Sequence, residues 1–358
     1  MKNKKEKIFI SGNEASGEAA IRAGCTFYAG YPITPQNELT AYMSRRMNEE
    51  KRTFIQAESE IAAINMVFGA SVAGAQCMTS SSSPGISLKQ EGVSYLAGCQ
   101  LPAVIINVMR GGPGLGNIAP SQADYFQATK GGGHGDYYMT VLAPSSVQEM
   151  FDLTYEAFDI ADKYRNPVMI LADGLLGQMM EQIVIKNKRE TNDEGRRTKQ
   201  WILDGCKGRK ARSIKSLFLG DGVLEKWNQG LQEKFAKMRK KEIRYETYKT
   251  DNAELIVVAY GTCGRIARSL VDELRKNGKK AGLFRPISLW PFPYSELKKL
   301  SNKKTKFLVI EMSAGQMVED VRLAVENDKK VYFHGRMGGE IPDDKDILKI
   351  ANKILNSR

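Results

Sequence analysis

Short apolar runs alternate with helical patterns over the first half of the chain. Residues 103–109 and 167–172 are almost entirely apolar, which is the pattern of strands buried on both faces. Residues 60–70 instead follow a helical spacing and include small side chains suited to close packing. This alternation of strands and helices predicts an α/β fold with a parallel sheet covered by helices.

A second unit of the same kind is predicted toward the C-terminus. Residues 255–260, 281–285 and 307–311 have the apolar character of strands, and residues 265–277 have that of a helix. Gly278 is a suitable residue to end that helix. The order of these segments predicts a smaller α/β domain.

The segment between the two units is basic and poor in apolar residues. Of the net charge of +12, residues 186–249 hold 19 Lys/Arg against 9 Asp/Glu, a difference of 10, and one exposed helix is predicted at residues 224–243. We therefore predict a domain at 1–185, a connector at 186–250 and a domain at 251–358. The charge comes with no zinc-finger spacing or interleaved aromatic residues, which favours a solvated connector or subunit-contact arm over a nucleic-acid-binding surface.

The composition argues against several other classes of protein. The chain shows no signal-peptide pattern and no apolar run long enough to span a membrane, so we expect a cytoplasmic protein. The five cysteines are far apart without a Cys-x-x-Cys pair, and only two histidines are present. We therefore expect neither a metal site nor an iron–sulfur cluster on this chain itself.

Two segments near the N-terminus carry candidate ligand-binding groups. Residues 29–35 form a loop after an apolar run, and Pro35 restricts the backbone of Thr34 at a predicted strand end. Glu58 and Glu60 lie where the first predicted helix of small residues begins. These carboxylates either complement the helix dipole or direct one carboxyl group at a ligand nitrogen.

Two further segments follow predicted strands. In the serine-rich run 79–85, Ser83 precedes Pro84, which predicts Ser83 as a helix N-cap above free N–H groups. Arg110 ends a strand and precedes the glycine-rich run 111–116, so it is placed to clamp a carboxylate. The run does not have the G-x-G-x-x-G spacing of a dinucleotide site.

These motifs together resemble the alpha, or pyrimidine-binding, subunit of 2-oxoacid:ferredoxin oxidoreductases. The resemblance covers nearly the whole chain except the connector. It rests on residues 31–35, 58–60, 110, 260–262, 285–287, 289–293, 315–317 and 335–339. It implies a thiamine-diphosphate-binding domain of the pyrimidine type, followed by a smaller domain similar to the C-terminal domain of transketolase. The glycine-rich runs 111–116 and 131–136 are similar to those of branched-chain (2-oxoisovalerate) members.

The resemblance implies a role for individual residues. Glu60 matches the family glutamate beside N1′ of the aminopyrimidine, where a shared proton allows C2 to be deprotonated. Thr34 and Arg110 match the residues that bind the carbonyl and carboxylate of the 2-oxoacid. The C-terminal domain is expected to pack and dimerise, with Cys263 and His334 structural. The other residues expected at the cofactor are Tyr31, Pro32, Ile33, Ser82 and Ser83.

The resemblance assigns the remaining chemistry to other chains. A Gly-Asp-Gly at 220–222 with Asn252 has the spacing of a Mg²⁺–diphosphate motif, but it lies in the connector without a long buried strand, so we assign no metal to it. We expect thiamine diphosphate to be shared with a beta subunit that carries Mg²⁺ and a [4Fe–4S] cluster. Gamma and delta (ferredoxin-like) subunits, ferredoxin, CoA and a 2-oxoacid are the other expected partners, and neither nucleic acid nor a membrane is expected.

The substrate is predicted from the residues after Arg110. No Lys or Arg occurs in 111–129, and Gly114, Leu115 and Ile118 are apolar, so the second carboxylate of 2-oxoglutarate would be left unpaired. We therefore predict 2-oxoisovalerate, with 2-oxoglutarate as the alternative. A transketolase or dehydrogenase component with another acceptor, a non-catalytic nucleotide-binding protein and a nucleic-acid-binding protein each fit fewer of the motifs.

Overall fold

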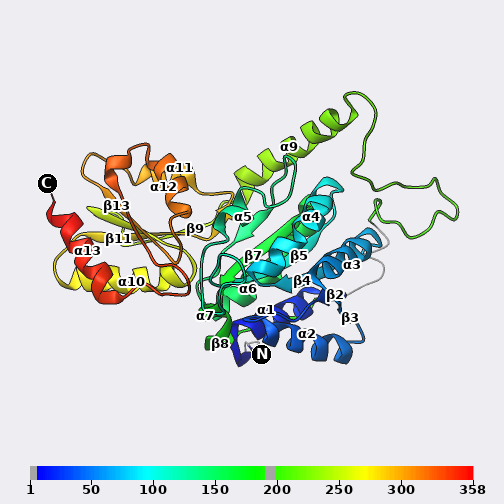
Figure 1. The fold of residues 1–358 in the computed structure, drawn as a ribbon, viewed down its shortest axis with the longest axis horizontal. Coiled ribbons are helices and arrows are strands. Elements are labelled where there is room, and N and C mark those ends of the chain that lie inside the picture. The colour runs from blue at the N-terminus through cyan, green and yellow to red at the C-terminus, as the bar shows by residue number, and fades with distance from the viewer. Residues whose placement is uncertain (1–5, 190–198, 358) are drawn as a thin grey trace, which may run out of the picture.

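Seven strands form the larger sheet of the computed structural model, which describes residues 6–189 and 199–357 (Figure 1). Neighbouring strands are parallel except at one edge, where the first two strands of the order below run antiparallel. Across the sheet the strands are β12 (Ser288–Trp290), β6 (Thr140–Leu142), β7 (Pro167–Asp173), β5 (Ala103–Met109), β4 (Cys77–Ser81), β2 (Phe27–Gly30) and β3 (Thr53–Gln56). Every residue of β5 and β7 is buried, which confirms both predicted strands.

Helices cover both faces of this sheet. α3 (Glu60–Val72) and α4 (Ser83–Gly98) pack on one face, where Ile105 of β5 points. The other face is covered by α1 (Gly12–Ala23), α2 (Asn37–Glu49) and α6 (Val147–Tyr164). Val104 and Ile106 point toward that second face, so successive residues of one strand fill two separate cores. The predicted helix at residues 60–70 is confirmed by α3.

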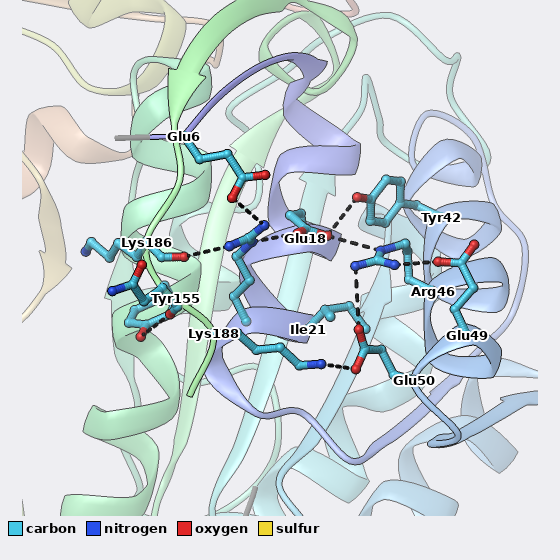
Figure 2. Close-up of polar contacts among 12 residues, drawn as sticks. Glu6, Glu18, Ile21, Tyr42, Arg46, Glu49, Glu50, Tyr155, Lys186 and Lys188 are labelled. Carbon is cyan, nitrogen blue, oxygen red and sulfur yellow. Dashed lines mark hydrogen bonds and ion pairs between the residues drawn. The ribbon is translucent and has the colours of Figure 1, made fainter. Parts of the chain in front are cut away.

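An ionic network joins α1 and α2 to the segment after β8 (Met180–Val184), which pairs antiparallel with β1 (Lys7–Ser11). Figure 2 shows the buried carboxylate of Glu18 at its centre. Glu18 accepts hydrogen bonds from Arg22 Nε at 2.6 Å, Tyr42 O–H at 2.8 Å and Arg46 Nε at 3.2 Å, and Arg22 Nη1 donates to the Lys186 carbonyl at 3.1 Å. Because a buried carboxylate needs such partners, the network fixes α1 against its neighbours.

The basic connector extends away from both sheets before it returns as a helix. In Figure 1 it is the long green loop that precedes α9 (Val223–Lys241). This helix confirms the one predicted at 224–243, and its buried residues Leu231 and Phe235 join the core on the α4 face. The connector residues 190–198 lie outside the described residues.

The C-terminal sheet has five strands. Across it lie β14 (Val331–Gly335), β13 (Lys306–Glu311), β10 (Leu255–Val258), β11 (Ala281–Pro286) and β9 (Tyr245–Tyr248), and only β9 is antiparallel. The associated helices are α10 (Gly261–Lys276), α11 (Tyr294–Lys299), α12 (Met317–Val325), η1 (Asp328–Lys330) and α13 (Asp344–Asn356). The strands and the helix predicted for this part of the sequence are therefore present.

Two short strands cross between the predicted parts of the chain. β12 leaves the C-terminal region and pairs with β6 of the seven-stranded sheet, and Trp290 stacks on Tyr138 with ring centroids 4.9 Å apart. β9, within the range predicted as connector, pairs with β11. The division at residues 185 and 250 stays a prediction about domains. Within the described residues, none of the helices combines the length and apolar character that a transmembrane span requires.

Candidate active site

Four predicted site segments follow four neighbouring strands. The strands β5, β4, β2 and β3 are adjacent and parallel, so their carboxyl ends meet at one edge of the sheet. Arg110 follows β5, the serine-rich turn follows β4, the loop 31–35 follows β2, and Glu60 begins the helix after β3. The carboxyl edge of an open parallel sheet is where such folds bind ligands.

Side-chain amides hold the loop after β2 in place. The Pro35 carbonyl accepts hydrogen bonds from Asn13 Nδ2 at 2.8 Å and Gln178 Nε2 at 3.1 Å. Gln36 is fully buried, and its Oε1 accepts a hydrogen bond from Ser80 Oγ at 2.6 Å. These contacts fix the backbone of the loop with little freedom. Sequence reasoning missed all three amides, because nothing local marks them as partners of the loop.

The first residues of this loop are accessible to solvent. Tyr31 and Pro32 are exposed, and Ile33 and Thr34 are half-buried. The Thr34 hydroxyl accepts a hydrogen bond from Asn37 Nδ2 through its Oγ1 at 3.2 Å. Its proton is still available to another acceptor.

Arg110 and Thr34 lie side by side. Arg110 Nη1 donates to the Thr34 carbonyl at 3.0 Å, and Nη2 donates to the Leu115 carbonyl at 3.0 Å. The contact with Thr34 therefore runs through its backbone. The side chain of Arg110 is buried, and its Nε–H has no hydrogen-bond partner among the described residues. A guanidinium oriented in this way has donors left for an anion.

Glu60 and Glu58 have opposite environments. Glu60 is only 5% exposed, whereas Glu58 is exposed. Ser59 between them is the N-cap of α3, and its Oγ accepts a hydrogen bond from Ala62 N at 3.2 Å. Within the described chain the Glu60 carboxylate makes no hydrogen bond or ion pair. It is therefore the carboxyl group available to a ligand at this edge.

Gly85 allows the Glu60 carboxylate to pack closely against α4. A Cβ atom at Gly85 would lie 2.4 Å from Glu60 Oε1 and 2.1 Å from Ser81 Oγ, so any other residue would displace them. The hydroxyls of Ser81 and Ser82 are buried and have no partner among the described residues. Since buried hydroxyls are normally hydrogen-bonded, this group of polar atoms fits the polar edge of a heterocycle such as an aminopyrimidine.

Ser83 has a different role from the one predicted. The N-cap of α4 is Ser82, and Ser83 is the first helical residue, followed by Pro84. Ser83 Oγ donates to Asp124 Oδ2 at 2.6 Å and accepts the Arg110 N–H at 3.0 Å. The pattern of serine before proline indicated the helix start but not which serine would bond to Asp124.

Asp124 is a site residue that sequence reasoning missed. Its Oδ2 accepts hydrogen bonds from Ser83 Oγ and from Asn107 Nδ2, the latter at 2.9 Å. Burial raises the pKa of the Asp124 carboxyl, and the two hydrogen bonds oppose this effect. The Asp124–Ser83 pair therefore holds the backbone of Arg110. A lone aspartate in a polar segment gave no signal in the sequence.

Arg110 and Asp124 face a cavity of about 410 Å³ between the two sheets. Its lining includes Met312, Gln316 and Met337, so the C-terminal region forms one wall. Arg110 is the only Lys or Arg among the lining residues, which are Ser83, Pro84, Ser87, Arg110, Gly112, Pro113, Gly114, Ser121, Ala123, Asp124, Met312, Ser313, Ala314, Gln316, Met337 and Gly338. Leu115 and Ile118 do not line it and are 81% and 64% exposed.

The other groups considered in the sequence, which are Cys263, His334 and Asp221, do not line this cavity. Cys263 is fully buried, and burial raises the pKa of its thiol well above the ordinary value. Burial lowers the pKa of His334, which lies on β14. Asp221 is exposed in the turn before α9, within the Gly-Asp-Gly sequence. Within the described ranges, no three His, Cys, Asp or Glu side chains converge as metal ligands would.

Two family descriptions match this chain. "Pyruvate flavodoxin/ferredoxin oxidoreductase, thiamine diP-bdg" matches residues 18–241, and "Pyruvate:ferredoxin oxidoreductase core domain II" matches residues 253–347. The first match includes all four site segments described above. These matches confirm the predicted fold class, with a thiamine-diphosphate-binding domain followed by a smaller α/β unit.

Individual relatives are similar over nearly their whole length. The ketoisovalerate oxidoreductase subunit VorB of Methanothermobacter thermautotrophicus is 51% identical over 345 residues, which cover 96% of this chain and 97% of that protein. The 2-oxoglutarate synthase subunit KorA of Archaeoglobus fulgidus is 41% identical over 340 residues, covering 93% and 96%. Among solved structures, the 2-oxoglutarate:ferredoxin oxidoreductase of Magnetococcus marinus, with 2-oxoglutarate, coenzyme A and succinyl-CoA bound, is 26% identical with a TM-score of 0.86. It covers 98% of this chain and 66% of that one.

Proposed function

This chain belongs to the 2-oxoacid:ferredoxin oxidoreductase family as an alpha subunit, and from that premise we propose that it provides the aminopyrimidine half of a thiamine-diphosphate site. The complete complex would oxidatively decarboxylate a 2-oxoacid to an acyl-CoA and reduce ferredoxin. The relatives that support this carry subunit names in which the substrate is ketoisovalerate or 2-oxoglutarate. This chain's own contribution is to bind, orient and exchange a proton.

The observation that carries the proposal is the arrangement of Arg110. Two backbone carbonyls, those of Thr34 and Leu115, fix its guanidinium at the wall of the cavity. Its buried Nε–H lacks a partner among the described residues, so an incoming carboxylate would complete its hydrogen bonding. We assign to Arg110 the carboxylate of the 2-oxoacid, and to the neighbouring Thr34 hydroxyl the keto oxygen.

The proposed cofactor site lies at the same edge of the sheet, around Glu60 after β3 and the serine-rich turn after β4. Thiamine diphosphate, when bound, supplies the carbon nucleophile and the electron sink of the reaction. Glu60 would hold the proton at N1′, since its carboxylate is buried, unpaired among the described residues and packed against Gly85. The hydroxyl of Ser82 would bind the polar edge of the ring. The residues proposed to line the rest of the site are Tyr31, Pro32, Ile33 and Ser83.

The substrate proposed is a branched 2-oxoacid, 2-oxoisovalerate. Among the described residues that line the cavity, Arg110 is the only cation, and the thioethers of Met312 and Met337 provide apolar surface. A branched tail gains about 0.8 kcal/mol per buried CH₂, whereas an unpaired second carboxylate costs several kcal/mol. The apolar residues that supply this surface come from the C-terminal region, not from Leu115 and Ile118 as the sequence suggested.

The remaining half of the reaction is proposed for partner subunits. A beta subunit would bind the diphosphate with Mg²⁺ and carry a [4Fe–4S] cluster, and gamma and delta subunits would pass electrons to ferredoxin. The word subunit in the names of the relatives supports an assembly of several chains. On this chain, four of the five cysteines are separately buried and Cys206 is exposed.

The test is a ferredoxin- or viologen-reduction assay of the whole complex with each 2-oxoacid in turn. We expect kcat/KM for 2-oxoisovalerate to exceed that for 2-oxoglutarate at least tenfold, since about 1.4 kcal/mol supplies that factor. Faster use of 2-oxoglutarate would overturn the substrate but keep the reaction class. No CoA-dependent reduction with any 2-oxoacid would overturn the class itself.

A further inference from the structure

A fully buried lysine lies beside the proposed cofactor site. Lys89 of α4 has no exposed surface, and its Nζ donates to Thr79 Oγ1 at 2.5 Å and to the Ser80 carbonyl at 3.4 Å. Both acceptors are neutral, and Nζ forms no ion pair with a described carboxylate. A buried ammonium without an ion pair is costly, so its presence calls for a physical reason.

The packing of α3 against α4 places Lys89 next to Glu60. Gly85, Lys89 and Gly92 are spaced by four and three residues, so they lie on one face of α4. Gly85 meets the Glu60 carboxylate, and a Cβ at Gly92 would lie 2.6 Å from Ile64, one helical turn after Glu60. Lys89 therefore lies between two close contacts of the helices, about 5–6 Å along α4 from the residue that touches Glu60.

We propose that Lys89 is a positioning residue that keeps the Glu60 carboxylate ionised for its role at the aminopyrimidine. The inference rests on the proposed role of Glu60. A cation in a low-dielectric interior favours the charged form of a neighbouring carboxyl group, even beyond hydrogen-bond distance. Because Lys89 does not bond directly to Glu60, the carboxylate oxygens stay free for the cofactor.

The charge on Lys89 is itself sensitive to Glu60. Burial lowers the pKa of Lys89 to about 7, and the negative charge of Glu60 acts in the opposite direction. Glu60 on α3 is the ionisable group that acts on Lys89, while the β4 residues that bond to it, Thr79 and Ser80, do not titrate near neutral pH.

Lys234 is a matched control. It lies on α9, donates to the Arg165 carbonyl at 3.2 Å, and burial lowers its pKa to about 7 as well. The charged group that acts on the pKa of Lys234 is Arg165, and among the described residues Lys234 has no such interaction with Glu60. Lys89→Met replaces a buried amine and Lys234→Met a half-buried one, each by an apolar side chain of similar length.

Thermal unfolding of the full chain gives a readout without cofactor. The pKa of Lys89 is lower in the folded chain than its ordinary value of 10.5, so stability from neutral Lys89 is present at high pH and is lost as pH falls toward about 7. Lys89→Met should therefore raise Tm by a few degrees at pH 7 and by less at pH 9. Glu60→Gln should lower Tm when Lys89 is present and not when it is methionine, whereas Glu60→Gln and Lys234→Met should be additive.

The second readout is the pH profile of C2–H exchange of thiamine diphosphate in the whole complex. Lys89→Met should move the half-maximal exchange rate to higher pH by about one unit or more. Lys89→Gln keeps a hydrogen-bond donor without the charge and should behave like methionine, and Lys234→Met should keep the parent profile. In a Glu60→Gln background, Lys89→Met should cause no further shift.

The outcomes distinguish a failure of the role proposed for Lys89 from a failure of the role proposed for Glu60. If Glu60→Gln leaves exchange unchanged, the proposed role of Glu60 is wrong. If Glu60→Gln abolishes exchange while Lys89→Met gives the parent pH profile and additive Tm values, only the role of Lys89 is wrong. A Lys89→Gln profile equal to the parent would likewise show that the hydrogen bond, and not the charge, is what matters.

Discussion

Two glutamates two positions apart show how closely local geometry controls this site. Glu58 precedes the N-cap Ser59 and is exposed, while Glu60 is the first residue of α3 and is buried beneath α4. A carboxylate near the N-terminus of a helix gains from the helix dipole in either position. Only Glu60, however, is packed against Gly85 of α4. The difference between the two residues is therefore one of packing and not of charge.

The pair gives an internal comparison for catalysis. In the assembled enzyme, Glu60→Gln should slow C2–H exchange of the cofactor by about 10²–10⁴-fold, the range of general acid–base catalysis. Glu58→Gln should change it by less than threefold, because Glu58 is exposed. The measurement is proton–deuterium exchange followed by quenching and NMR, with subunit content checked for each variant. Equal effects of the two substitutions would refute the assignment.

At the level of elements, the segment between β5 and α5 (Tyr125–Thr129) is held by the C-terminal region. Gln316 is the main link: its Oε1 accepts the Phe126 N–H at 2.8 Å, and its Nε2 donates to the Ala123 carbonyl at 2.7 Å. The carbonyl of Met312 accepts the Gln122 N–H at 2.8 Å. These bonds bracket Asp124, so a C-terminal side chain helps to position the segment that carries the substrate-binding wall.

Gln316→Ala should therefore weaken substrate binding more than the chemical step. We expect KM for the 2-oxoacid to rise about tenfold, equivalent to about 1.4 kcal/mol, because two hydrogen bonds to the loop are lost. Steady-state kinetics of the whole complex measure this. Cys263→Ala and His334→Ala are controls from the same region, and turnover per folded complex should stay within a few-fold. A fall in kcat alone for Gln316→Ala would contradict the positioning role.

The whole chain combines a parallel sheet that presents Glu60 and Arg110 at one edge with a C-terminal region that closes one side of the cavity lined by Arg110. The diphosphate half of the cofactor is proposed to lie on another subunit, so the half-site of this chain alone would use only part of the available binding free energy. Binding of a cofactor held from two sides depends on both sides being present.

Isolated, this chain should bind thiamine diphosphate more weakly than micromolar and show no 2-oxoacid oxidation. Calorimetry of the purified chain, compared with the complex reassembled from its subunits, measures the difference. Thermal shift gives a second readout, since a ligand stabilises the folded state in proportion to its occupancy. Tight binding by the chain alone would place the diphosphate site here and overturn the division between subunits.

The sequence by itself determined the strands and the order of the polar segments that follow them. β5 and β7 were predicted from uninterrupted apolar runs, because strands buried on both faces leave such runs. Since parallel strands align their carboxyl ends, the proximity of Thr34 and Arg110 could also be predicted. The resemblance to the family then supplied roles that pattern alone left open, including the choice of Glu60 over Glu58.

Only the tertiary structure decided which distant groups meet. The pairing of β12 with β6, the inward turn of Ser83 toward Asp124 and the contribution of Gln316 to the cavity all join residues far apart in the chain. Local periodicity encodes which face of an element is buried, but it does not specify the partner that buries it. Lys89 illustrates the limit, because a lysine in an amphipathic helix is expected at the surface, and the close packing of α3 on α4 encloses it instead.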